Sequence, residues 1–220
     1  MKTAGTGTRW VITRLLLGGL AWAVISGSIA AAGVLDDFVA EFDPAYQYSL
    51  AGTSTGSFAG KGYTSYVLDM TSQTWRSPSE VDRTEWQHYL TVVVPDELHF
   101  SDALLMIGGG SNHNNPSPPS SPPFELVAAA INSELKYIPN EHLTFSDETF
   151  SRTEDGIISY TFDKFLDTGD ADWPLLLPMV KSAVRAMDTI QDFIPNQMPG
   201  TMVDEFVISG ASKRGWTTWL

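Results

Sequence analysis

The sequence predicts an α/β fold built on a doubly wound, mostly parallel sheet. Short apolar runs with strand character alternate along the chain with amphipathic stretches of helical periodicity. A strand–helix–strand unit in the middle of the chain implies parallel pairing of its two strands. In the final segment an apolar run leads into a serine between glycines and then into the start of a helix, which predicts a sharp turn at the edge of the sheet.

The early strands are expected over residues 63–70 and 88–94, where apolar side chains recur at extended spacing. The run Ala103–Ile107 is apolar throughout and ends in three glycines, which predicts a strand buried on both faces. A proline-rich loop follows. A helix over residues 124–132 and a fourth strand over residues 135–138 then complete the strand–helix–strand unit.

Two amphipathic helices are predicted between residues 149 and 193. The first is expected to stop near Gly169, and the second to begin at Pro178. Their apolar stripes are predicted to belong to the core, and they consist of Ile157, Ile158, Thr161 and Phe165 in the first helix and Val180, Ala183, Val184, Met187 and Ile190 in the second. A short strand over residues 206–209 then leads to the serine.

The turn around Ser212 has the composition of a nucleophile elbow, the tight strand-to-helix turn that presents the catalytic serine of α/β-hydrolases. Gly210 and Gly215 are the small flanking residues that such a turn needs. The pattern differs from Gly-x-Ser-x-Gly because Arg214 stands two residues after the serine and the glycine comes one residue late. An ordinary surface turn is the alternative. The elbow favours an α/β-hydrolase-like sheet, truncated after the elbow strand.

The three glycines that follow the strand at residues 103–107 predict an oxyanion loop, because glycine lets a backbone N–H approach a developing alkoxide closely. We expect the N–H of Gly109 or Gly110 to act together with the N–H of Lys213. A dinucleotide or phosphate turn is the alternative, but a helix should then open directly on the glycines. No cofactor is expected. The Lys213 and Arg214 side chains are expected either to bind an anionic group of a substrate or to cap the turn.

The remaining polar candidates have weaker patterns. His113 lies beside the glycines, but its place in the chain is wrong for the general base of a hydrolase. His88 is expected to be structural, and His99 and His142 are expected to lie in loops. One acidic stretch superficially resembles a calcium-binding loop but lacks the terminal glutamate, so no metal site is predicted. It contains Asp167, Asp170 and Asp172.

The order of residues in the chain bears on the catalytic partners of the serine. In α/β-hydrolases the acid and the histidine follow the serine. Eight residues follow Ser212, and none of them is Asp, Glu or His. We therefore expect residues 33–220 to be the N-terminal part of a hydrolase-like domain. Its acid and histidine would lie beyond Leu220, and the part by itself would be inactive.

The N-terminus has the layout of a signal peptide over residues 1–32. Three cationic residues precede an apolar stretch over residues 15–29, which closes on three alanines. Cleavage is expected near Ala30 or Ala32, and an uncleaved membrane anchor is the alternative. We therefore expect a secreted or periplasmic protein without stable membrane association after cleavage.

The charge and the cysteine content of the chain limit which kinds of partner and of stabilising bond are expected. Removal of the three N-terminal cations takes the formal net charge from −13 to −16, so nucleic acid is disfavoured as a partner. The chain has no cysteine, and its cohesion must come from a buried core instead of disulfides.

Several segments together resemble the PhoPQ-activated pathogenicity-related protein family, from about Asp36 to the end of the chain. The most specific of these is Gly-Ala-Ser-Lys-Arg-Gly-Trp-Thr at residues 210–217; the others are residues 86–88, 137–140, 160–170 and 183–188. The resemblance implies an α/β-hydrolase-like fold and export. The family that the chain resembles includes secreted eukaryotic members that act in growth signalling. The charged pair after the serine is also similar to that of glucuronoyl-type carbohydrate esterases.

Two functions of different classes follow. In the first, the protein is an exported serine hydrolase: Ser212 attacks an ester or amide carbonyl, and a histidine beyond Leu220 takes its proton. The substrate would be a small-molecule, peptide or carbohydrate ester. In the second, a hydrolase scaffold serves secreted binding or signalling without catalysis.

Overall fold

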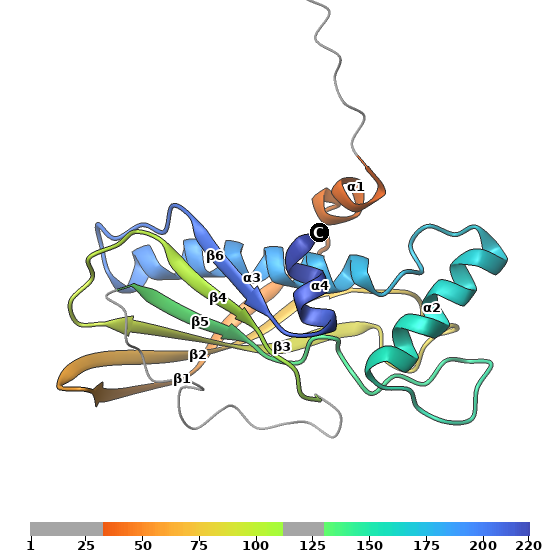
Figure 1. The fold of residues 1–220 in the computed structure, drawn as a ribbon, viewed down its shortest axis with the longest axis horizontal. Helices are drawn as coiled ribbons and strands as arrows, with labels where there is room; N and C mark the ends of the chain where they lie inside the picture. Colours follow the sequence, from red (N-terminus) through yellow and green to blue (C-terminus); the bar gives the residue numbers. More distant parts are fainter. Residues whose placement is uncertain (1–32, 112–129) are drawn as a thin grey trace, which may run out of the picture. The chain divides into compact units, whose positions relative to one another are not determined.

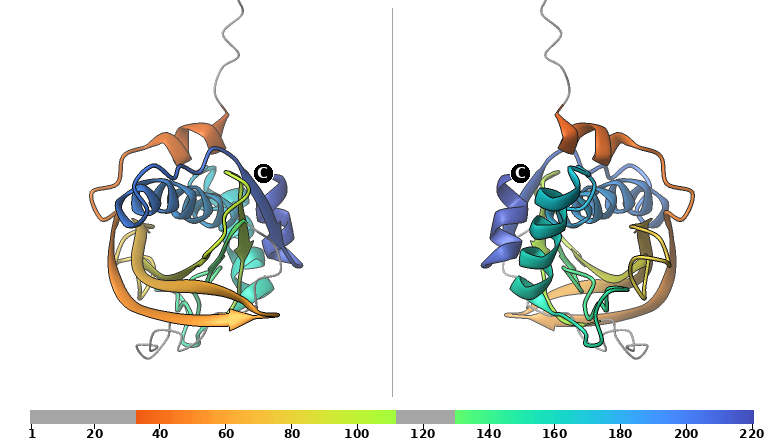
Figure 2. Two further views of the ribbon diagram at one scale, coloured as in Figure 1. Left: turned by 90° about the vertical axis from the view of Figure 1, so that its left-hand side faces the viewer. Right: turned by 90° about the vertical axis from the view of Figure 1, so that its right-hand side faces the viewer.

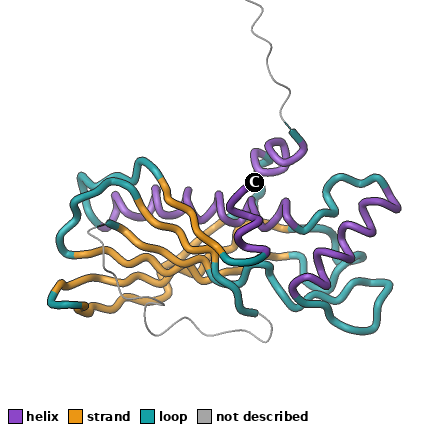
Figure 3. Tube along the Cα trace, viewed as in Figure 1, coloured by secondary structure: helices purple, strands orange, loops and turns teal. Residues whose placement is uncertain are grey.

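The computed structural model describes residues 33–111 and 130–220. Within these ranges the chain forms one sheet with helices packed beside it (Figures 1 and 3). The predicted signal peptide lies outside the described residues, as do His113 and most of the helix predicted over residues 124–132. In chain order the elements are α1 Val34–Ala40, β1 Gln47–Phe58, β2 Lys61–Thr74, β3 Glu85–Pro95, β4 Ala103–Ile107, β5 Ile131–Leu135, α2 Glu154–Thr168, α3 Leu176–Gln197, β6 Phe206–Gly210 and α4 Lys213–Trp219.

The sheet has the order β1-β2-β3-β5-β4-β6. Strands β1, β2 and β3 pair antiparallel, and β3 is also antiparallel to β5. Strand β4 lies between β5 and β6 and is parallel to both. The predicted α/β class is confirmed, but the sheet is mixed instead of mostly parallel. The reason is the N-terminal meander, whose short connections can join only antiparallel neighbours.

The predicted strands at residues 63–70 and 88–94 lie inside β2 and β3, and the strand at 103–107 is β4. The fourth strand was placed too late. It is β5, and residues 131 and 132, predicted as helical, are part of it. The sequence of β5, Ile-Asn-Ser-Glu-Leu, does not look like a strand, yet all five residues are buried because β5 pairs on both sides. Strand β1 and helix α1 were not predicted.

Helix α3 covers one face of the sheet and packs against β2 and β3 (Figure 2). The core beneath it includes Leu68, Leu90 and Trp86 from the strands and Ile190 and Phe193 from the helix, all buried. Of the predicted apolar stripes, Ile157 and Ile158 of α2 and Ala183 and Ile190 of α3 belong to this core, and Phe165 and Met187 pack against it. Val184 is only partly buried and lies outside the core cluster. Helix α2 ends at Gly169, whose φ of 72° is the left-handed cap conformation that glycine favours. No helix within the described ranges is long and apolar enough to cross a membrane.

Candidate active site

The two glycine motifs of the sequence meet at one edge of the sheet. Strands β5, β4 and β6 are parallel, so their carboxyl ends lie together. Ile107, the last residue of β4, pairs with Leu135 of β5 on one side and with Gly210 of β6 on the other. The three glycines after β4 and Ser212 after β6 therefore leave the sheet from the same edge, as ligand sites of open α/β sheets do.

Ser212 has a strained backbone at the junction of β6 and α4. Its φ of 57° and ψ of −127° are rarely adopted by a residue with a side chain. A Cβ atom on Gly210 would lie 2.6 Å from the Arg214 carbonyl oxygen, and one on Gly215 would lie 2.9 Å from the Gly210 carbonyl oxygen. The turn is therefore tight enough to require glycine on both sides. Such a strand–turn–helix corner is the geometry of a nucleophile elbow.

The glycine loop after β4 is fastened to the chain that follows β5. The N–H of Gly108 donates to Leu135 O (2.8 Å), and the N–H groups of Tyr137 and Ile138 donate to Gly109 O and Gly108 O (both 3.1 Å). Gly110 has a φ of 99°. Within residues 33–111 and 130–220, the N–H groups of Gly109, Gly110 and Lys213 donate no hydrogen bond.

The side chains of Lys213 and Arg214 contact protein carboxylates. Lys213 Nζ pairs with Glu154 Oε2 and lies 3.1 Å from Asp155 Oδ1. Arg214 Nη2 donates to Glu154 Oε1 (2.6 Å), and Arg214 Nε donates to Ile138 O (2.6 Å). From the sequence, these side chains are expected either to bind an anionic group of a substrate or to cap the turn. Their contacts with protein carboxylates favour the second alternative.

Glu154 was not singled out from the sequence, yet it receives both cations. Burial opposes ionisation of its carboxyl, but the hydrogen bonds from Lys213 and Arg214 outweigh burial and lower its pKa. Burial likewise disfavours the charged form of Lys213, but its bonds to Glu154 and Asp155 raise its pKa. The N–H of Glu154 donates to Glu141 Oε2 (2.7 Å), and burial raises the pKa of the Glu141 carboxyl. The directions of these two shifts keep Lys213 and Glu154 ionised near neutral pH.

The described histidines do not complete a catalytic triad. His88 is buried, bonded through Nε2 to Ser72 Oγ (2.9 Å) and through Nδ1 to Lys136 O (3.0 Å), which confirms its structural role. Burial lowers the pKa of His88 to about 4. His99 and His142 lie in loops as predicted. In the part of the chain that the structure describes, the Ser212 hydroxyl makes no hydrogen bond.

His142 nevertheless lies next to the glycine loop. Its Nδ1 is 3.1 Å from Ser111 Oγ, and the Ser111 hydroxyl also donates to Glu141 O (2.8 Å). Ser111 directly follows Gly110, so this contact fastens the far end of the loop. The sequence offered no signal for it, because Ser111 and His142 are 31 residues apart.

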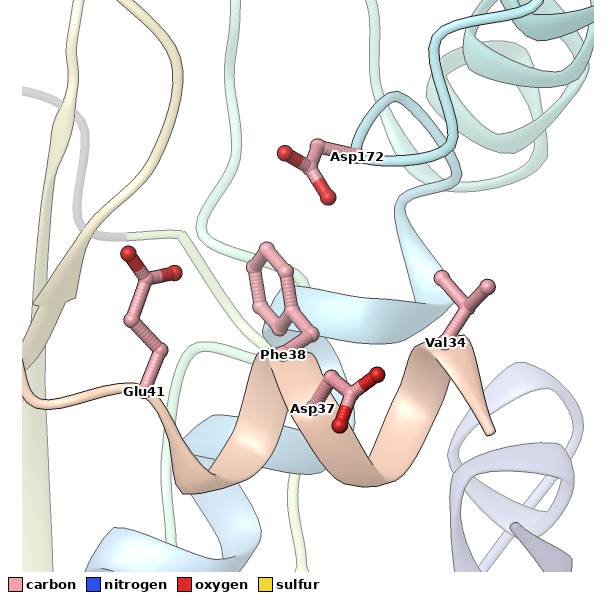
Figure 4. A pocket seen from close by; sticks show the side chains of 5 residues that line it. All are labelled: Val34, Asp37, Phe38, Glu41 and Asp172. Carbon is pink, nitrogen blue, oxygen red and sulfur yellow. The ribbon is translucent and has the colours of Figure 1, made fainter. Parts of the chain in front are cut away.

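In the acidic stretch that resembles a calcium-binding loop, the carboxylate of Asp170 contacts other protein groups. Asp170 accepts a hydrogen bond from Arg76 Nη1 (2.9 Å), and its other oxygen accepts from the N–H of Asp172 (3.0 Å). Asp172 also lines an open pocket of about 390 Å³ together with residues of α1 (Figure 4). The lining residues are Val34, Asp37, Phe38, Glu41 and Asp172. None of them belongs to the elbow or to the glycine loop.

The chain is similar to several known proteins. The family model described as PhoPQ-activated pathogenicity-related protein matches residues 35–220. Autocrine proliferation repressor protein A of Dictyostelium discoideum is 36% identical over 191 residues, which cover 84% of this chain and 37% of that protein. Two solved structures of a glucuronoyl esterase from Solibacter usitatus share 14% identity at a TM-score of 0.45, over 84% of this chain and 52% of theirs. The chain thus spans little more than a third of its curated relative.

Proposed function

Because the chain belongs to the PhoPQ-activated pathogenicity-related protein family, we propose that it is an exported serine hydrolase in which Ser212 is the nucleophile. The observation that carries this proposal is the strained backbone of Ser212 at a strand–helix corner, at the edge it shares with the glycine loop. Strained backbone persists where the surrounding structure enforces it, and it concentrates at functional sites.

In the proposed reaction, Ser212 Oγ attacks the carbonyl carbon of an ester or amide and forms a tetrahedral intermediate. A histidine that follows Leu220 in the longer protein takes the hydroxyl proton and returns it to the leaving group, and an acid orients that histidine. The N–H of Lys213 and the N–H of Gly109 or Gly110 stabilise the oxyanion. Their assignment to the oxyanion hole is supported because none of the three amides donates a hydrogen bond within the described residues.

The test is Ser212→Ala in the full-length protein, assayed on a panel of activated esters. Loss of the nucleophile is expected to lower kcat by about 10⁴- to 10⁶-fold, while the unfolding transition stays in place. Ser209→Ala, on the strand just before the elbow, is the matched control and should retain activity. Equal turnover by wild type and Ser212→Ala would remove the serine mechanism.

A second function, a secreted binding or signalling protein on a hydrolase scaffold, is favoured by the name of the Dictyostelium relative, which describes repression of proliferation. It predicts that the wild-type protein hydrolyses no member of a broad ester and peptide panel. It also predicts that Ser212→Ala leaves binding to its partner unchanged.

Export rests on the cationic start and on the alanines that close the apolar stretch. Mass spectrometry of the protein recovered outside the cytoplasm is expected to find an N-terminus near Ala31 or Gly33. Recovery of peptides that retain Met1 in a membrane fraction would favour an uncleaved anchor instead.

A further inference from the structure

The Arg214 side chain joins three segments that meet at the elbow. Arg214 itself lies on the first turn of α4, two residues after Ser212. Its Nε donates to Ile138 O, and its Nη2 donates to Glu154 Oε1, both at 2.6 Å. The guanidinium also lies against Gly109, because a Cβ atom on that glycine would be only 2.5 Å from Nη2. A single planar group carried by the elbow helix thus contacts the glycine loop, the chain after β5 and the start of α2.

Glu154 holds this arrangement from the other side. Its two carboxylate oxygens are divided between the cations: one accepts from Arg214 and the other pairs with Lys213. The exposed fractions of these side chains are only 9% for Lys213 and 14% for Arg214. Without the carboxylate, two neighbouring cations with little access to water would repel each other.

Glu154 is itself fixed in place. Its φ of 51° is unfavourable for a residue with a side chain, and its N–H donates to Glu141 Oε2 at 2.7 Å. Residues in such conformations persist where surrounding contacts hold them. The carboxylate is therefore presented to the elbow by a defined backbone and not by a flexible loop.

We infer that Glu154 is a positioning residue for the oxyanion hole: it holds Arg214 against Gly109 and so sets the separation between the glycine loop and Ser212. This inference rests on the proposed function. An oxyanion hole built from two separate segments works only if their N–H groups are held at hydrogen-bonding distance from one oxygen. Arg214 is the side chain that spans both segments, and Glu154 orients it without touching the substrate.

The experiment is Glu154→Gln in the full-length protein. Glutamine keeps the size of the side chain, but a neutral amide cannot pair with both cations. Misplacement of the hole weakens stabilisation of the transition state more than binding of the substrate. We expect kcat on an activated ester to fall about 10- to 100-fold while KM changes less than about threefold.

Glu148→Gln is the matched control. Glu148 is close in sequence to Glu154 and forms a two-bond ion pair with Arg152 (2.5 and 2.6 Å). Among the residues that the structure describes, its side chain forms no hydrogen bond or ion pair with the elbow. The same chemical change there should leave kcat within about twofold of wild type. An equal fall in kcat for both variants would show a general effect of losing an ion pair and would overturn the inference.

Two further variants separate positioning from folding. Glu154→Asp keeps the charge and should recover part of the kcat lost in Glu154→Gln. Arg214→Lys keeps the positive charge, but an ammonium lacks the planar fork that reaches Ile138 O and Glu154 together, so kcat should fall as in Glu154→Gln. These variants carry the test if Glu154→Gln does not fold.

Hydrogen exchange of the peptide that contains Gly108–Ser111 gives a readout independent of catalysis. Faster exchange of this peptide is expected in Glu154→Gln and not in Glu148→Gln. If wild-type protein hydrolyses esters but neither kcat nor exchange changes in Glu154→Gln, the positioning role is wrong and the proposed function stands. If wild type hydrolyses nothing, the proposed function fails, and the exchange result alone decides whether Glu154 holds the loop.

Discussion

The two halves of the sheet differ in strand length and in the places where their backbone is irregular. The antiparallel half, β1 to β3, has strands of 11 to 14 residues, and α3 packs on β2 and β3. The parallel half, β4 to β6, has strands of five residues that end in irregular backbone. Positive φ in the first half includes the two-residue hairpin turn at Ala59 and Gly60. In the second half it occurs where the chain leaves the sheet, at Gly110, Tyr137 and Ser212.

One hydrogen-bond network in each half shows a second difference. Between the antiparallel half and α3 the network is neutral: Ser72 Oγ bonds to His88 Nε2 and to Ser182 Oγ, both at 2.9 Å. Beside the parallel half the groups are charged, and Lys213 and Arg214 share Glu154. Neutral networks fix a core at low cost, whereas charges with little access to water are costly to bury unless paired. The network beneath β2 and β3 is thus neutral, whereas the network at the candidate site is ionic and lies beside the strained backbone of Ser212.

Gly210→Ala is the strongest test of this division. The added Cβ would lie 2.6 Å from the backbone oxygen of Arg214, so the elbow must open. We expect kcat on an activated ester to fall at least about 100-fold and the free energy of unfolding to drop by about 1–3 kcal/mol. Gly52→Ala in β1 is the control, since its Cβ meets nothing within 4 Å. It should change stability by less than about 0.5 kcal/mol and leave kcat unchanged. Equal effects of the two substitutions would break the comparison.

A smaller effect is expected from the pH dependence of stability. Burial lowers the pKa of His88 from 6.5 to about 4, so above pH 6.5 the folded and unfolded states both hold it neutral. As the pH falls from 6.5 towards 4, the His88 side chain binds a proton in the unfolded state but stays neutral in the folded state. The contribution of His88, roughly 3 kcal/mol, is therefore lost in this window. Urea unfolding between pH 7 and pH 4 measures it.

His88→Gln is the variant that isolates this contribution. A neutral amide cannot take up the proton, so the slope of unfolding free energy against pH should flatten between 6.5 and 4. The same slope in wild type and variant would show that other groups, such as the carboxylates around the elbow, control acid stability.

The sequence predicted what is local and missed what is distant. The elbow and the glycine loop could be located because glycines next to a serine, or after an apolar run, indicate a backbone conformation that other residues rarely adopt. The polar run of β5 was misplaced because pairing on both sides, not hydrophobicity, makes it a strand. Glu154 could not have been found, since it lies 59 and 60 residues from the cations it pairs with. Only the tertiary fold brings these residues together.

The position of β4 between β5 and β6 limits where relatives of this chain can gain or lose residues. The register of Ile107 with Gly210 determines how far the glycine loop and Ser212 extend past the sheet. Slippage by one residue would displace one segment by about 3.3 Å, more than the length of a hydrogen bond. Insertions and deletions within β4 or β6 should therefore be absent from active relatives, whereas the hairpin turn between β1 and β2 can change length without altering this offset.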